Sequence, residues 1–429
     1  MRRFSMRSWL VMSAVGFGWA ASASATEPVS PSIRRAEAIL STPADRLDIQ
    51  LVGCTEDACD LSCADVVGEC VGECEDGGCC LFGDHEPFDL GTTILGEDSG
   101  WDVGGWVSAG YTNKSDGVFN TRPDALNLHQ AWLFIEKIAD GSEGFDWGAR
   151  VDALYGLDGE NTQAYGNPNR DRWDFQDSFD HGAFHYALPQ AYGVLAYDKL
   201  SVKIGHFFTP AGYEVVNANG NFFYSHSFTH NFAEPFTHTG ALATYTASDD
   251  VTLYGGWVAG WDTGFARNNG SSSFIGGATV KATDDLTLSY ITVIGNNGFI
   301  GDGNTHHLVA TLALTDKLNY ILYSDINHGN RGAAGGVTTF HSVSAANVLL
   351  YNINDKLAAG ARAEWAKING VSYNEVTLGV NIKPKANIII RPEVRHQWSP
   401  AANKAGGANP IGLPTTDDTI LGIDAILTF

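Results

Sequence analysis

The stretch TILGIDAILTF, residues 419–429, alternates apolar with small or polar side chains and ends on an aromatic residue. Side chains of an extended strand point alternately to its two faces, so this period of two predicts a strand. Its apolar face carries Leu421, Ile423, Ala425, Leu427 and Phe429. The opposite face is mixed and includes Asp424 and Thr428. One apolar and one mixed face is the pattern of a strand that lies between lipid and a polar interior.

Residues 1–25 have the features of a cleaved secretory signal peptide. Arg2, Arg3 and Arg7 form a positive start, an apolar stretch follows, and 23–25 (ASA) is a small-residue cleavage site. The apolar stretch is too short for the alternative, a membrane anchor. We therefore expect export by the general secretory route.

The alternation seen at 419–429 recurs upstream and predicts about sixteen strands. No segment after residue 25 reaches the roughly 20 consecutive apolar residues that a spanning helix needs. An exported, alternating chain without such a helix favours an all-β fold, a transmembrane antiparallel β-barrel over 101–429. The predicted strands are 101–112, 126–138, 143–155, 182–197, 201–208, 237–247, 251–262, 273–282, 286–295, 304–314, 318–327, 337–351, 357–366, 371–382, 387–398 and 417–429.

The connections between these strands fall into two kinds. Tight polar turns, such as 198–199 and 283–285, follow the even-numbered strands, and mostly longer loops follow the odd-numbered ones. Bacterial outer-membrane barrels have this layout, with short periplasmic turns and long external loops. It implies an even strand count with both barrel termini on the short-turn side.

Charged residues of several predicted strands fall on one face, and that face must be the barrel interior. A charge on the lipid face near the bilayer midplane would cost about 2–4 kcal/mol. The inward residues that we expect to line a pore wall are Arg150, Asp152, Lys203, Arg362, Glu364, Arg391, Glu393 and Arg395. A charged interior indicates water, and sixteen strands enclose a lumen wide enough for a channel. Strand 126–138 is ambiguous, because its apolar residues fit neither face cleanly.

The loop 209–236 is unusually rich in aromatic residues for an external loop. Such a loop would be costly in water, so we expect it to fold into the lumen and narrow the pore. Its predicted constriction residues are Tyr213, Glu214, Phe222, Phe223, Tyr224, His226, His230 and Glu234. An acidic loop facing a basic wall predicts a transverse field across the pore. The alternative is a loop packed on the barrel rim or on a neighbouring subunit.

All the cysteines of the chain lie in one acidic segment, 54–80, of a periplasmic N-terminal region, 26–100, that ends in a linker. They are Cys54, Cys59, Cys63, Cys70, Cys74, Cys79 and Cys80. An exported chain can keep disulfides, so we expect three bridges and one spare thiol that could link to another chain. A zinc site is the weaker alternative, because the cysteine spacings contain no paired C-x-x-C knuckles. Free thiols are the third possible state of these cysteines.

The formal net charge of −23 argues against nucleic acid as a partner, because phosphates demand a basic surface. The aspartates that recur every three residues at 171–180 lack the spacing of a Ca²⁺ loop. His306 and His307 would point to opposite faces of one strand, so they make a poor metal pair. No motif of a hydrolase, nucleotide-binding enzyme or metalloprotease appears. We therefore expect no enzyme activity, no cofactor and no metal, and a hydrolase with a rim Ser/His pair is a minor alternative.

Residues 203–207, 214–216, 221–227 and 235–240 resemble the outer-membrane β-barrel porin type 2 family, the OmpL-like porins. Residues 133–137 before a short turn also fit, and the resemblance covers roughly 100–429. It implies a passive channel in the outer membrane. It does not account for the cysteine-rich segment 54–80.

Two functions follow from these observations. The first is an outer-membrane porin, trimeric by analogy with barrels of this size, that passes small hydrophilic solutes and has at most a mild cation preference. The second is an envelope-structural protein, in which the barrel anchors a segment that crosslinks through disulfides to the cell wall or to other envelope proteins.

Overall fold

The structure is a computed structural model that describes residues 88–96, 99–166, 171–266, 270–333, 336–404, 406–414 and 416–429, without the side chains of 332–338. The predicted signal peptide 1–25 and the cysteine-rich segment 54–80 lie outside the described residues. Among the described residues, no helix is long and apolar enough to cross a membrane.

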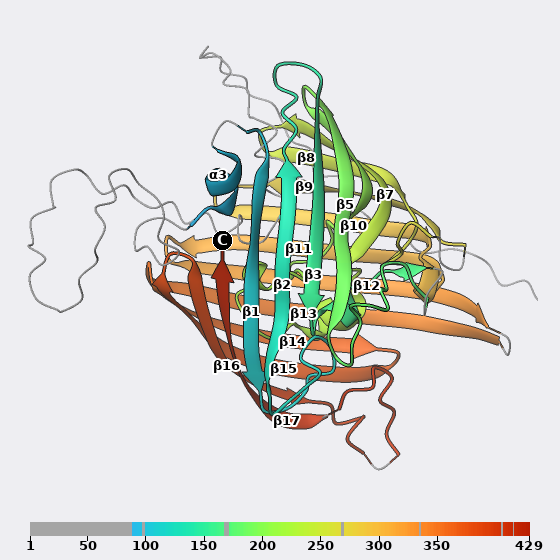
Figure 1. The fold of residues 1–429 in the computed structure, drawn as a ribbon. Helices are drawn as coiled ribbons and strands as arrows, with labels where there is room; N and C mark the ends of the chain where they lie inside the picture. Colours follow the sequence, from blue (N-terminus) through green and yellow to red (C-terminus); the bar gives the residue numbers. More distant parts are fainter. Residues whose placement is uncertain are drawn as a thin grey trace, which may run out of the picture. The chain divides into compact units, whose positions relative to one another are not determined.

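The described residues form a closed barrel of sixteen antiparallel strands (Figure 1). Consecutive strands pair along the chain, and the last strand pairs with the first, with Trp106 opposite Thr428. The predicted fold class is therefore confirmed, and each predicted strand overlaps one observed strand. The strands are β1 (Asp102–Thr112), β2 (Leu126–Lys137), β3 (Asp146–Gly156), β5 (His185–Tyr197), β6 (Leu200–Phe208), β7 (Thr237–Ser248), β8 (Val251–Val258), β9 (Ser272–Lys281), β10 (Leu286–Asn296), β11 (Asp302–Thr315), β12 (Leu318–Ala333), β13 (Gly336–Asn354), β14 (Leu357–Ile368), β15 (Val371–Lys385), β16 (Ile388–Trp398) and β17 (Asp417–Thr428).

Short helices lie before the first strand and in the connections. They are α3 (Leu90–Leu95), α4 (Gly159–Thr162), η1 (Ala218–Gly220), α5 (Phe228–Ala233) and η2 (Gly298–Ile300). Helix α3 and the C-terminus lie at the same end of the barrel (Figure 1). This arrangement agrees with the prediction that both barrel termini lie on the short-turn side.

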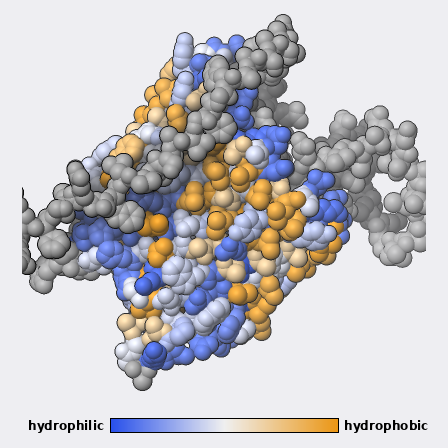
Figure 2. All heavy atoms as spheres, turned by 180° about the vertical axis from the view of Figure 1, so that it is seen from behind, coloured by the Kyte–Doolittle hydropathy of each residue, from blue (hydrophilic) through white to orange (hydrophobic). Residues whose placement is uncertain are grey.

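Burial alternates along the strands as the sequence pattern predicts. On β14, Arg362 and Glu364 are buried inside the barrel, whereas Trp365 between Glu364 and Ala366 is exposed on the outside. On β15, Leu378 is 52% exposed and the adjacent Thr377 is fully buried. Hydrophobic side chains gather over the strands on the face shown in Figure 2. The outer surface is thus suited to lipid, while ionisable residues point inward.

A β-bulge in β2 explains why strand 126–138 fitted neither face. Ser108 of β1 lies opposite Gln130, but the next residue, Ala109, lies opposite Leu128. His129 is therefore an extra residue, and His129 and Gln130 are both buried. A bulge shifts the alternation by one residue, which moves every later side chain to the other face.

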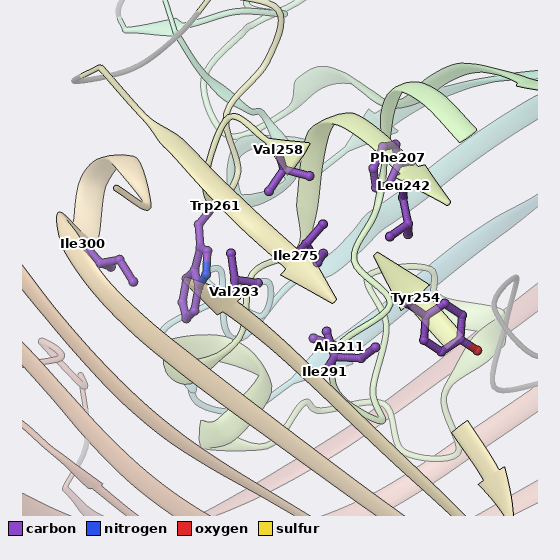
Figure 3. Packing of buried hydrophobic residues seen from close by; sticks show 10 residues of the cluster. All are labelled: Phe207, Ala211, Leu242, Tyr254, Val258, Trp261, Ile275, Ile291, Val293 and Ile300. Atoms are coloured by element: carbon purple, nitrogen blue, oxygen red, sulfur yellow. The ribbon is translucent and has the colours of Figure 1, made fainter. Parts of the chain in front are cut away.

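One part of the barrel interior is apolar, which adds to the charged interior that several strands predict. Buried side chains of β6 to β10 pack there against Ala211 and Trp261 from the connecting loops (Figure 3). The cluster consists of Phe207, Ala211, Leu242, Tyr254, Val258, Trp261, Ile275, Ile291, Val293 and Ile300. Inward-facing ionisable residues are concentrated instead on β14 to β17.

Candidate functional site

The loop 209–236, between β6 and β7, lies inside the barrel. It contains η1 and α5, and most of its residues are buried. Its backbone is hydrogen-bonded to inward-facing side chains of β14 and β16. These contacts define the candidate site. We call residues 209–236 the inner loop, and the inward-facing side chains of β14 and β16 that bind it the anchoring wall.

Two wall carboxylates accept hydrogen bonds from the inner loop's backbone. Glu393 of β16 accepts from the N–H groups of Tyr224 at 2.9 Å and Ser225 at 3.1 Å. Glu364 of β14 accepts from the N–H groups of Phe228 at 2.7 Å and Thr229 at 2.6 Å. The second pair belongs to the first turn of α5, where free N–H groups favour a negative charge.

Two wall arginines donate to the inner loop's carbonyl groups. Nη1 of Arg391 lies 2.8 Å from the carbonyl oxygen of Ala218, 2.7 Å from that of Asn221 and 3.1 Å from that of Phe223. Nη1 of Arg395 donates to the carbonyl oxygen of His226 at 2.5 Å. The planar guanidinium can make several such bonds at once, so these arginines fix the path of the loop backbone.

A third arginine, Arg362, forms an ion pair with Glu214 of the inner loop, with 2.5 Å between Nη1 and Oε1. It also pairs with Glu375 of β15, and its Nη1 donates to the carbonyl oxygen of Ser225 at 2.9 Å. Burial alone would raise the pKa of Glu214, but Arg362, together with His226 and His230, lowers that pKa to about 2. Glu214 is therefore an anion that belongs to the anchoring contacts.

Aromatic residues of the inner loop pack against further parts of the barrel wall. Tyr213, Phe222 and Phe223 join a cluster on β11 to β13, where the Tyr213 ring stacks on Tyr323 with 5.5 Å between centroids. The Tyr224 hydroxyl lies 2.7 Å from Nε2 of His129 at the β2 bulge. The inner loop thus contacts strands on several sides of the lumen, as expected for a segment that crosses it.

The remaining predicted loop residues, His226, His230 and Glu234, are all buried. The His226 and His230 rings stack with 4.6 Å between centroids. Burial lowers the pKa of His226 and, more strongly, that of His230, which favours the neutral form of both imidazoles. Nδ1 of His230 lies 3.4 Å from Oε2 of Glu234.

The predicted wall residues form two groups rather than one basic surface. Arg362, Glu364, Arg391, Glu393 and Arg395 lie beneath the inner loop and are buried. Arg150 instead pairs with Glu136 and Asp152, each at 2.7 Å, and Lys203 lies over the Tyr192 ring at 4.3 Å.

The ion pairs of the wall arginines bear on the predicted transverse field, which stays a prediction. Arg391 pairs with Asp424 at 2.6 Å, and Arg395 pairs with Glu375 at 2.7 Å. Together with the Arg362 pairs, these contacts place the cations of the anchoring wall in short buried ion pairs. All three arginine side chains are buried.

Two spaces adjoin the inner loop. A gap of about 10 Å³, lined by Ser108, Gln130, Tyr224 and Asp424 among others, has room for about one water molecule. A cavity of about 320 Å³ lies on the long-loop side and is lined by Tyr165, Arg172, Phe232, Trp261, Phe299 and Phe340 among others. The first of these two spaces thus has a far smaller volume than the second.

Some residues of the site were not singled out in the sequence. Glu375, Asp424 and His129 all contact the anchoring arginines or the inner loop. Strand alternation places Asp424 and Glu375 inward, and that signal could have identified them. Their pairing with particular arginines depends on strand register and could not.

The candidate Ca²⁺ aspartates do not converge in the structure. Asp174 accepts hydrogen bonds from the backbone N–H groups of Ala164 and Leu188, whereas Asp171 and Asp177 are exposed. His306 and His307 lie on opposite faces of β11, as predicted. His307 is buried inside the barrel, and His306 is half-buried and contacts the Tyr290 hydroxyl.

Comparisons with known proteins agree with this architecture. The family model described as "Putative beta-barrel porin-2, OmpL-like" matches residues 100–429. A comparison with curated proteins gives no match. The solved structures to which the chain is similar include three porins or channels.

One is the anion-selective porin from Comamonas acidovorans, with a TM-score of 0.52, 10% identity, and coverage of 77% of this chain and 99% of that one. Another is the outer membrane channel DcaP of Acinetobacter baumannii, with a TM-score of 0.50, 12% identity, and coverage of 78% of this chain and 99% of that one. A third is a mutant porin of Rh. blastica, with a TM-score of 0.51, 16% identity, and coverage of 77% of this chain and 100% of that one. At these identities the likeness concerns the fold, and the family match adds the function. The chain belongs to the OmpL-like β-barrel porin-2 family and is an outer-membrane porin.

Proposed function

We propose that the inner loop is the constriction of this porin and sets the size of the solutes that diffuse through it. The observation that carries the proposal is its anchoring: Glu364 and Glu393 accept from four backbone N–H groups, and Arg391 donates to three carbonyl groups. A loop held by so many charge-assisted bonds is a fixed part of the lumen.

The substrates that we propose are small hydrophilic solutes that move by passive diffusion. The burial of most of the inner loop inside the barrel supports a low size limit, and the cavity of about 320 Å³ on the long-loop side supports entry from that side. We propose no catalytic activity. By analogy with barrels of this size, we propose a homotrimer in the outer membrane, exported with a cleaved signal peptide at 1–25.

Liposome swelling with sugars of increasing size tests the size limit, using the full-length chain. The account predicts that only the smallest sugars enter with the wild type, and that Arg391→Lys, which loosens the loop backbone, admits larger ones. Equal size limits for the two folded proteins would contradict the constriction.

The alternative function, an envelope anchor, is not favoured by the family membership. A disulfide link from the cysteine-rich segment 54–80 to another envelope protein stays a separate prediction. Gels run with and without reductant check it, because crosslinked ladders collapse on reduction and a single unchanged band contradicts the link.

A further inference from the structure

Three ionisable side chains converge where the inner loop ends beside β11 and β12. Glu234 follows α5, and His307 and Asp325 lie directly opposite each other on the two strands. Their exposed fractions are 5%, 1% and 0%. One candidate ligand atom from each residue lies within 4.8 Å of the other two, and Nδ1 of His307 is 3.0 Å from Oδ2 of Asp325.

Several polar atoms of this group have no hydrogen-bond partner among the described residues. They are Oε1 of Glu234 and Oδ1 of Asp325; Oδ2 of Asp325 and Nδ1 of His307 face each other at 3.0 Å without hydrogen-bond geometry. Leaving buried carboxylate oxygens without donors costs considerable free energy. Buried atoms of this kind that lie within 4.8 Å of one another form a candidate set of ligands for a cation.

The neighbouring residues orient these atoms toward one another. Nε2 of His307 lies 3.1 Å from the Thr305 hydroxyl, and a proton on Nε2 leaves the lone pair of Nδ1 free for a metal ion. The side-chain amide of Asn327 on β12 donates to the carbonyl oxygen of Ala233 at 2.6 Å. This bond holds Ala233, the residue before Glu234, beside that strand.

Gly212 allows the Glu234 carboxylate to take this position. A Cβ atom at residue 212 would lie 2.2 Å from Oε2 of Glu234, and the residue has a φ of +83°. Only glycine adopts that conformation readily and leaves the space free. The backbone at the start of the inner loop thus accommodates a carboxylate at its end.

Arginine does not neutralise this group. Across the described residues, the arginine ion pairs involve Glu136, Asp152, Glu214, Glu375 and Asp424. The close ionic neighbours of Glu234 and Asp325 are histidines instead. Burial, Asp325 and Glu214 raise the pKa of Glu234 well above its ordinary value. Two buried carboxylates this close require a proton or a metal ion between them.

We propose that Glu234, His307 and Asp325 bind a divalent transition-metal ion, with Zn²⁺ as the best fit. Imidazole nitrogen and carboxylate oxygen are common zinc ligands, with bonds of about 2.0–2.2 Å. A tetrahedral ion holds its ligand atoms roughly 3.3–3.5 Å apart, so small side-chain rotations would close the site. The ion ties the end of the inner loop to β11 and β12, on a different part of the wall from the arginine contacts.

Zinc binding to the folded, full-length chain in detergent tests the site. The cysteines are first alkylated, because the thiols of 54–80 could bind zinc themselves. Metal content after dialysis is then compared for the wild type, Glu234→Gln, Asp325→Asn and the control Asp174→Asn, which removes a buried carboxylate in another loop. We expect about one Zn²⁺ per chain in the wild type and the control, and at least a tenfold weaker binding in the two site variants.

Heat-modifiable migration on gels shows which variants fold, and a rise in Tm on adding Zn²⁺ gives a second readout. That rise is expected for the wild type and Asp174→Asn alone. Equal zinc content and equal Tm shifts in folded wild type and Asp325→Asn would overturn the proposal and assign a shared proton to the carboxylate pair. If both site variants fail to fold, the wild type alone decides: the absence of bound zinc after dialysis would also overturn the proposed metal site.

Discussion

Glu214 and Arg362 form an ion pair inside the barrel that connects the inner loop to β14, with 2.5 Å between the charged atoms. The guanidinium of Arg362 also pairs with Glu375, so one cation holds two carboxylates from different segments. Every member of this group is buried. The relationship makes the position of the loop depend on wall charges that could otherwise line a pore.

Arg362→Met should strongly destabilise the barrel, because it leaves Glu214 and Glu375 buried without their cation. Removing one partner of a buried pair typically costs about 3–5 kcal/mol. Denaturant unfolding in lipid vesicles, followed by tryptophan fluorescence, measures the loss. Lys281→Met serves as the control, because the Lys281–Asp284 pair is exposed and contributes little. Similar stabilities for the two variants would show that the buried pair is not an anchor.

Arg391→Lys should loosen the inner loop while the barrel stays folded. Lysine keeps the charge, but its ammonium group cannot span Asp424 and three loop carbonyls at once. Limited chymotrypsin digestion should then cut faster at the aromatic residues 222–224. Arg150→Lys is the matched control, since Arg150 pairs with Glu136 and Asp152 and not with the loop. Identical cleavage rates for both variants would contradict the role of Arg391.

The anchoring through Glu214 should weaken at low pH. Its pKa is lowered to about 2 from an ordinary value of 4.5, so its contribution to stability is complete above pH 4.5. The contribution is lost as the pH falls through about 2, because protonation removes the charge that Arg362 binds. The Tm difference between the wild type and Glu214→Gln should therefore shrink from pH 6 to pH 2.5. A constant difference over that range would mean that the charge of Glu214 does not matter.

Ion selectivity should be low, with at most a mild cation preference. Arg362, Arg391 and Arg395 are paired with acidic residues, so they contribute little free positive charge, whereas the chain as a whole has a formal net charge of −23. Reversal potentials across a KCl gradient measure this property. A clear anion preference would show that cations of the wall face the solute after all.

The sequence predicted the strands and their faces well because a barrel strand has a simple physical constraint. Charges such as Arg362 and Glu364 cannot face lipid, so alternation alone assigns them inward. The same reasoning failed at His129, where a bulge changes the register without an obvious sequence signal. The aromatic content of 209–236 correctly predicted a loop that avoids water.

Alternation could not predict the partners of the inward charges. Alternation places Arg391 inward, and in the structure it donates to carbonyl groups of residues far away in sequence. The local sequence pairs His307 only with its neighbour His306, which points to the opposite face of the strand. The residues that approach it, Asp325 and Glu234, come from another strand and from the inner loop. Such contacts follow from strand register and loop path, which local patterns do not contain.

Single-channel conductance of the full-length protein in planar bilayers tests the central claim most directly. The wild type is compared with the double variant Glu364→Gln, Glu393→Gln, which weakens the bonds to four loop N–H groups, and with Glu136→Gln, an inward carboxylate without loop contact. The account predicts small steps for the wild type and the control, and larger or fluctuating steps for the double variant. Equal conductance in all three folded proteins would contradict the inner loop as the constriction.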